Sequence, residues 1–247
     1  MAPHPASIAT LSDGLLLDAR RAVWLPGPRT LAVADTHLGY AWAQRTRGAL
    51  LPVSALDDTT ERLVALQRDH RPDRIVVLGD VVHRAVALPA LEASLRDLCA
   101  RLSPASELVF CLGNHDHKLD RLVAGLGLPV VCRRQLRLGG HLLLHGDIAP
   151  EAAEDGEGFR LQAAAAPRAI IGHEHPAITL GDGVASSAKC PAFLVADDLL
   201  VMPAFSPWAA GCELGARPFL GPLARAARFQ TAFACVGPRL LRLPLKK

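Results

Sequence analysis

Five short apolar runs, each followed by a polar residue or a glycine, constrain the fold of this chain more than any other feature. They are rich in Val, Ile, Leu or Phe and occupy residues 31–34, 75–79, 108–113, 142–144 and 169–171. Runs this short and this uniformly apolar are typical of strands that are buried on both faces. The pattern therefore favours a buried sheet.

Helix-like stretches separate these runs. We expect helices over residues 54–69, 88–100 and 117–125, the first with Ser54 as its N-cap. The alternation of strand and helix predicts an α/β fold, and no linker or repeat divides the chain, so we expect a single domain over residues 1–247. After Gly181 the pattern changes: residues 191–202 and 231–243 resemble strands, with a loop over residues 203–222 between them.

The amino-acid composition limits the class of protein but does not identify a binding partner. Half of the residues are hydrophobic and the net charge is +3, a basic balance too weak to indicate nucleic-acid binding by itself. The six cysteines form no CxxC pair, so we expect reduced thiols. No apolar run is long enough to span a membrane and the N-terminus lacks a signal-peptide pattern, so we expect a cytoplasmic protein.

The polar residues at the strand ends share a chemistry. Six of the ten histidines lie there, beside carboxylates and an amide, in the order Asp35, His37, Asp80, His83, Asn114, His115, Asp116, His145, His173 and His175. In open α/β sheets the functional crevice lies beyond the carboxyl ends of the strands. Imidazole, carboxylate and amide oxygen together suit Mn, Fe, Zn or Co ions. Because Asp80 can bridge two cations, the set predicts a two-metal hydrolytic site.

Each of these motifs alone is common in proteins that have no such site. Together, the series D-x-H, G-D-x-x-H, G-N-H-D, H-G-D and G-H-x-H over residues 35–176 resembles the calcineurin-like metallophosphoesterases. The resemblance implies a four-layer αββα double sandwich and a catalytic histidine at His115. It also implies two metal sites that share Asp80, one completed by Asp35, His37 and His175, the other by Asn114, His145 and His173.

A narrower resemblance covers nearly the whole chain. His83, the loop over residues 47–52 and the segment over residues 189–214 together look like the bacterial DNA ligase-associated metallophosphoesterases, and His83 also resembles the nuclease subunit of the double-strand-break repair complex. This resemblance implies an endonuclease or phosphodiesterase of DNA repair. Its partners would be DNA, a repair DNA ligase and a helicase, and its cofactors two divalent ions, with Mn²⁺ before Fe²⁺, Zn²⁺ or Co²⁺.

The remaining site residues receive provisional roles. We expect His115 to protonate the leaving alkoxide, and His83 to support His115 or contact substrate. Asp116 either orients nearby imidazoles or caps the following helix.

Substrate contacts are harder to assign from the sequence. Arg45, Arg47 and Arg84 follow the metal motifs and are candidates for phosphate contacts. Tyr40, Trp42, Phe205 and Trp208 are candidates for stacking on a base, although core packing suits Phe205 better.

Three functions stay open at this stage. They are a metal-dependent DNA phosphodiesterase, a small-molecule phosphodiesterase and a non-catalytic scaffold. The first two share a site and differ in the cleft, and the short linkers between the motifs favour an open site. The scaffold predicts eroded ligand positions, whereas every position here is filled.

Overall fold

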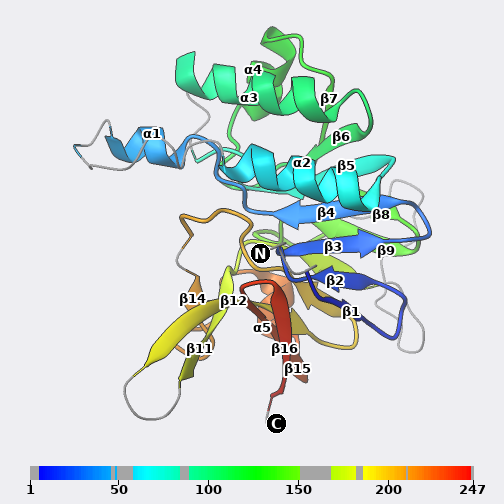
Figure 1. Cartoon of the computed structure of the whole chain (residues 1–247), viewed down its shortest axis with the longest axis vertical. Coiled ribbons are helices and arrows are strands. Elements are labelled where there is room, and N and C mark those ends of the chain that lie inside the picture. Colours follow the sequence, from blue (N-terminus) through cyan, green and yellow to red (C-terminus); the bar gives the residue numbers. More distant parts are fainter. Residues whose placement is uncertain are drawn as a thin grey trace, which may run out of the picture.

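The computed structural model describes residues 6–45, 48, 58–83, 89–150, 168–181, 186–209 and 211–245. Two multistranded sheets dominate the described residues (Figure 1). The first sheet has seven strands in sequence order, namely β1 (Ile8–Thr10), β2 (Leu16–Asp18), β3 (Ala22–Leu25), β4 (Thr30–Ala34), β5 (Arg74–Leu78), β6 (Glu107–Cys111) and β7 (Val130–Arg133). Strands β4 to β7 are parallel, and β1 to β4 are antiparallel neighbours.

The second sheet has the order β14-β11-β12-β13-β10-β9-β8, and β12 also pairs with β15, which pairs with β16. Strands β9, β10 and β13 run parallel to one another at its centre. The strands are β8 (Gln135–Leu138), β9 (His141–Leu144), β10 (Ala169–Ile171), β11 (Pro176–Gly181), β12 (Ser187–Val195), β13 (Leu199–Val201), β14 (Cys212–Glu213), β15 (Thr231–Val236) and β16 (Arg239–Pro244).

The helices cover the outer faces of the sheets. Figure 1 shows α2, α3 and α4 on the side of the first sheet that faces away from the second. Their apolar side chains join those of that face, and the short α5 packs against the outer face of the second sheet. The helices are α1 (Tyr40–Arg45), α2 (Asp58–His70), α3 (Pro89–Leu102), α4 (Leu119–Gly125) and α5 (Pro222–Ala226).

The core between the sheets explains why the sequence runs are apolar throughout. Ala32, Val76 and Val109 of the first sheet face Ile170 and Leu200 of the second in one buried cluster. Neighbouring residues of the same first-sheet strands face the helices instead. A strand that is covered on both faces has no side exposed to solvent, so its sequence does not alternate between apolar and polar residues. The predicted αββα double sandwich is confirmed.

Several predicted boundaries need correction. Residues 191–202 form two antiparallel strands, because a turn in which Ala196 N–H donates to Leu199 C=O reverses the chain. Residues 231–243 are likewise a hairpin, which turns at Gly237 with φ +56°. Helix α4 begins two residues later than predicted, because Lys118 adopts a left-handed conformation. Residues 54–57, with the predicted cap Ser54, lie outside the described residues, and α2 begins at Asp58.

All six cysteines are free, and four of them are buried. None of the helices in the described ranges is long and apolar enough to cross a membrane.

A buried ion cluster connects β2 to α2. The carboxylate of Asp18 is 1% exposed, and it lies 2.7 Å from Arg20 Nη2 and 2.9 Å from His70 Nε2. Burial alone would raise the pKa of Asp18, but the hydrogen bonds from His70 and Arg20 outweigh it and hold this pKa well below its usual range. The contribution of Asp18 to stability is therefore present above the ordinary carboxyl pKa of about 4 and is lost as the pH falls below it.

We expect Asp18→Asn to lower the free energy of unfolding by about 2–3 kcal/mol near pH 7, because it removes the negative charge that accepts hydrogen bonds from Arg20 and His70. The difference from wild type should shrink below about pH 4. Urea unfolding at several pH values measures both effects. The matched control is Asp73→Asn, which breaks an exposed 3.0 Å pair with Arg29 and should cost about 0–1 kcal/mol. Equal losses in the two variants would contradict the assignment.

Candidate metal centre

The loops that follow β4 and β5 stay hydrogen bonded after both strands have ended. Asp35 N–H donates to Gly79 C=O at 3.2 Å, and His37 N–H donates to Asp80 C=O at 2.8 Å. This pairing brings Asp35, His37 and Asp80 to one edge of the first sheet. All three side chains are buried or nearly so.

The second sheet supplies three more imidazoles from its parallel centre. His145 follows β9, while His173 and His175 follow β10, and Gly172 N–H donates to His145 C=O. The two sheets meet here directly, because His173 N–H donates to Asp35 Oδ2 at 3.0 Å. The strand ends of both sheets therefore converge on one site.

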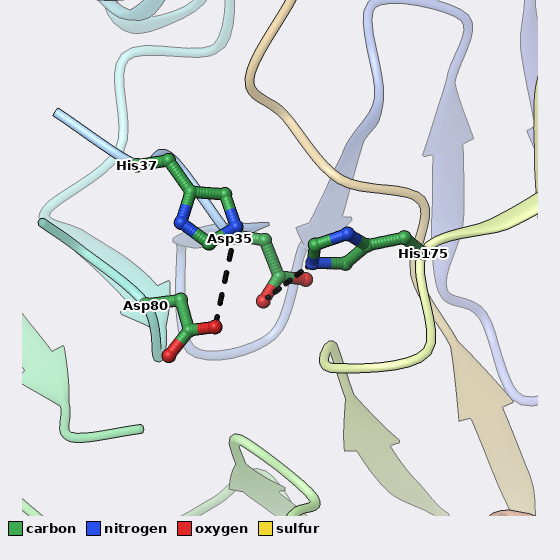
Figure 2. A group of neighbouring side chains, drawn as sticks. All are labelled: Asp35, His37, Asp80 and His175. Atoms are coloured by element: carbon green, nitrogen blue, oxygen red, sulfur yellow. Dashed lines mark ion pairs between the residues drawn. The ribbon is translucent and has the colours of Figure 1, made fainter. Parts of the chain in front are cut away.

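Four of these residues form a compact cluster of donor atoms (Figure 2). Asp35, His37, Asp80 and His175 each offer one ligand atom, and these atoms all lie within 4.8 Å of one another. His175 Nε2 lies 3.4 Å from Asp35 Oδ1, and His37 Nε2 lies 4.0 Å from Asp80 Oδ2. Two carboxylates and two imidazoles suit a borderline divalent cation.

Two observations test whether the cluster fits a cation. His175 Nε2, which faces Asp35, is buried without a hydrogen-bond partner, which is costly for a polar atom unless something else contacts it. Burial also lowers the pKa of His37 to about 4, so its imidazole is neutral near pH 7 and keeps a lone pair. The donor set therefore fits a metal ion.

A second set of donors surrounds His145. Its Nε2 lies 3.1 Å from Asn114 Oδ1, 3.1 Å from His173 Nδ1 and 3.5 Å from Asp80 Oδ1. Its Nδ1 faces the carbonyl of Leu78 at 3.3 Å, and a carbonyl only accepts, so we assign the ring proton to Nδ1 and a lone pair to Nε2. Nε2 then faces two oxygen atoms that also only accept, Asn114 Oδ1 and Asp80 Oδ1, an arrangement that a cation between them would stabilise.

His115 and His83 lie beside these donors. His115 N–H donates to Asp80 Oδ1 at 3.0 Å, and its ring Nδ1 lies 3.1 Å from the carbonyl of His83. The two rings stack with centroids 5.9 Å apart and planes at 24°. With Nδ1 donating to that carbonyl, Nε2 of the exposed His115 ring is the atom available to a substrate. His83 therefore contacts His115 through both its backbone carbonyl and its ring.

Asp116 has a different role from the two that the sequence suggested. Its buried carboxylate accepts hydrogen bonds from the backbone amides of Val81, Val82 and Gly113. Helix α4 has no side-chain cap, so the prediction that Asp116 caps it is wrong. Burial raises the pKa of Asp116 to about 6 although these amides oppose the shift. Asp116 holds together the loops that carry Asp80 and Asn114, which makes it a positioning residue.

The glycines that directly precede three of the candidate ligands are a steric requirement that the sequence analysis did not identify. A Cβ on Gly79 would lie 2.1 Å from the ring of His145, and one on Gly172 would lie 2.6 Å from Asp35 Oδ2. A Cβ on Gly113 would lie 2.6 Å from Asp80 Oδ1. The space beside each glycine is filled by a ligand from another strand. Recurrent glycine directly before Asp80, Asn114 and His173 was the available signal.

Glu174 was also missed, although it lies between two candidate ligands. Its buried carboxylate accepts hydrogen bonds from Leu220 N–H at 2.9 Å and from Gly221 N–H at 2.6 Å. It thereby ties the loop that carries His173 and His175 to the segment before α5. The only sequence signal was that Glu174 lies between two histidines in G-H-E-H, so its side chain is expected to point away from theirs and from the metal centre.

The predicted substrate contacts have mixed outcomes. Arg45 is exposed at the end of α1 and lies over the ring of Trp42 at 5.6 Å. Arg47 and Arg84 lie outside the described residues, as does most of the loop over residues 47–52. Phe205 is fully buried in the core, as its sequence context suggested.

A family model matches this chain, and solved structures resemble it. The family model of the calcineurin-like phosphoesterases matches residues 28–160. A search of the curated proteins gives no match. Among solved structures, the chain resembles the nuclease MPE of Pseudomonas putida with a TM-score of 0.65 and 24% identity, over 96% of this chain and 100% of that one. It resembles the E. coli phosphoesterase Yfce with a TM-score of 0.39 and 16% identity, over 88% and 99%.

The superfamily resemblance drawn from the sequence motifs is therefore confirmed. The matched family model covers more than half of the residues and ends after four of the five metal motifs. The chain belongs to the calcineurin-like phosphoesterases, and the protein is a hydrolase that acts on phosphate esters.

Proposed function

We propose that this protein is a two-metal phosphodiesterase that cuts DNA in the course of repair. The observation that carries the two-metal part is the position of Asp80. Its Oδ2 faces His37 of the first donor set, and its Oδ1 lies 3.5 Å from His145 of the second. One carboxylate that presents a different oxygen to each set is suited to bridge two cations.

The proposed ligand sets follow from these contacts. Asp35, His37, Asp80 and His175 would hold one divalent ion, and Asp80, Asn114, His145 and His173 would hold the other. Bound divalent ions would supply Lewis acidity toward the phosphate and lower the pKa of the attacking water. Mn²⁺ is the first ion to test, before Fe²⁺, Zn²⁺ or Co²⁺.

A side chain of the protein itself would supply the proton that the leaving group needs. His115 is fixed by its bond to the carbonyl of His83, and its backbone amide is anchored on Asp80. We assign its Nε2 to donating a proton to the leaving oxygen of the diester, the step that most needs help with an alkoxide. Asp116 keeps the loops that carry Asp80 and Asn114 in register.

Two considerations support DNA as the substrate. The structurally similar Pseudomonas putida protein is named a nuclease. The depression beside His37 is open to solvent, as a polymer substrate requires. The proposed partners, a repair DNA ligase and a helicase, and the proposed cytoplasmic location rest on the narrower family resemblance alone.

The proposal is tested by assaying bis-p-nitrophenyl phosphate and labelled single- and double-stranded DNA side by side, with and without Mn²⁺. Both should be cleaved only with metal, and Asp80→Ala should lower both rates by more than about 100-fold, the most that loss of an outer-shell partner costs. Diester turnover with intact DNA would replace the proposal with a small-molecule phosphodiesterase. Inactivity on both with metal bound would indicate a scaffold.

Removing the proposed acid should separate catalysis from metal binding. His115→Asn should lower DNA cleavage by about 10²–10⁴-fold while the metal content stays at the wild-type value. The loss should be smaller for bis-p-nitrophenyl phosphate, because p-nitrophenolate leaves without needing a proton. His117→Asn, an exposed histidine on the same turn, is the matched control and should keep both rates. Equal losses on the two substrates would show that His115 is not the leaving-group acid.

The glycine requirement gives a prediction that changes no ligand. Gly113→Ala should weaken metal affinity by at least about tenfold, because its Cβ would collide with Asp80 Oδ1 and with the ring of His145. Gly125→Ala meets no atom within 4 Å and lies in α4, so it should leave affinity unchanged and add about 0.5–1 kcal/mol of stability. Calorimetric Mn²⁺ titration and thermal unfolding measure both. Wild-type affinity in Gly113→Ala would contradict the assigned site.

A further inference from the structure

A shallow depression adjoins the metal centre on the side of α1. Its walls include His37, one of the candidate ligands, so a group in the depression lies next to the metal centre. The empty space between its walls includes a part that is open to solvent. The other residues that the argument uses are Tyr40, Trp42, Thr59, Thr60, Asp97 and Trp208.

Aromatic side chains are concentrated in this depression. The chain has three tryptophans and one tyrosine, and three of these four residues line it. All three, Tyr40, Trp42 and Trp208, are partly exposed, whereas Trp24 is buried in the core. Large rings left half-exposed on a protein that has few of them indicate a contact surface.

The rings form a continuous row that leads to the proposed acid. Trp208 and Tyr40 stack with centroids 6.1 Å apart and planes at 18°. Tyr40 meets the ring of His83 edge-on at 4.8 Å, and His83 stacks on His115 at 5.9 Å. A flat ligand group that stacks on the end of this row is therefore separated from His115, and so from the scissile bond, by only a few rings.

The charges of the depression fit a neutral ring better than a phosphate. Among the described residues that line it there is no Lys or Arg, and the carboxylate of Asp97 belongs to it. A phosphate would avoid that carboxylate and favour the cation-binding side at His37. Thr59 and Thr60 add hydroxyl-bearing side chains to a wall that combines polar groups with the aromatic faces.

We infer that this depression is a nucleobase subsite, in which the base of a nucleotide extends the stack formed by Trp208 and Tyr40 while its phosphate lies at the metal centre. The inference rests on the proposed function for the nature of the substrate. Stacking on aromatic faces is tolerant of sequence, because every base has a π-face. The subsite therefore selects for a base over a bare sugar phosphate, and only weakly among the four bases.

The test compares two ligands that differ only in the base. Thymidine 5′-monophosphate and 2-deoxyribose 5-phosphate are titrated into the wild-type protein with Mn²⁺ in a calorimeter. We expect the nucleotide to bind about 5- to 150-fold more tightly, the range that base–aromatic stacking provides. In Trp208→Leu and in Tyr40→Leu this ratio should fall toward one, whereas Trp208→Phe and Tyr40→Phe should retain most of it.

A control and a second readout guard against misfolding. Leu241→Ala removes an exposed apolar side chain from β16, which contributes nothing to the site, and should keep the wild-type ratio. Nucleotide binding should also quench the fluorescence of Trp208, measured as the difference between the wild type and Trp208→Phe, so this contact is read without the leucine variants.

The outcomes separate this inference from the proposed function. A wild-type ratio near one, or the same ratio in the leucine variants, overturns the base subsite even if DNA is cleaved. Because the assay measures equilibrium binding, it does not depend on turnover. A protein that cuts no DNA but shows the expected ratios would refute the proposed substrate and retain the subsite.

Discussion

The carboxylates of Asp35 and Asp80 connect the two sheets, and the rest of the site depends on them. Both belong to the first sheet and are buried, and each lies 3.5 Å from a ring nitrogen of His145 in the second. Asp35 also accepts the backbone amide of His173. Buried carboxylates are costly unless charge and hydrogen bonds compensate them. The contacts that compensate these carboxylates therefore also hold the two sheets together at the site and position the donor atoms.

The backbone at the strand ends adopts strained left-handed conformations where the loops that carry the candidate ligands come together. Nine described non-glycine residues have positive φ, and five of them are candidate ligands, namely Asp35, His37, Asp80, His173 and His175. The left-handed conformation is tolerated best by Asn, Asp and His among side-chain-bearing residues, which are also the ligand types used here. Such conformations persist only where surroundings enforce them. The hydrogen bonds between the loops after β4 and β5 provide that enforcement.

The apolar pattern of the sequence indicates where strands end, but not how the strands divide between the two sheets. Apolar runs ending in Asp or His identify the strand ends whatever sheet they belong to. Nothing in those runs indicates that β4, β5 and β6 belong to one sheet and β9 and β10 to another, because both sheets bury both faces. The N-terminal strands β1 to β3 have only three or four residues, too few for a period to appear. Roles set by backbone contacts, such as those of Asp116 and Glu174, have no signature in spacing.

The candidate metal ligands and the proposed base subsite belong to different parts of this chain, and hydrogen bonds connect those parts. The ligands lie at strand ends, whereas Tyr40 belongs to α1 and Trp208 to the loop after β13. That loop is fastened to the ligand strand, because Phe205 N–H donates to Ala34 C=O and Ser206 N–H donates to Asp35 C=O. Arg62 holds the same loop from α2 by donating to Phe205 C=O at 2.7 Å. These hydrogen bonds hold the backbone of the loop that carries Trp208 in a fixed position relative to Asp35. The side chain at position 208 can therefore be exchanged without moving that backbone.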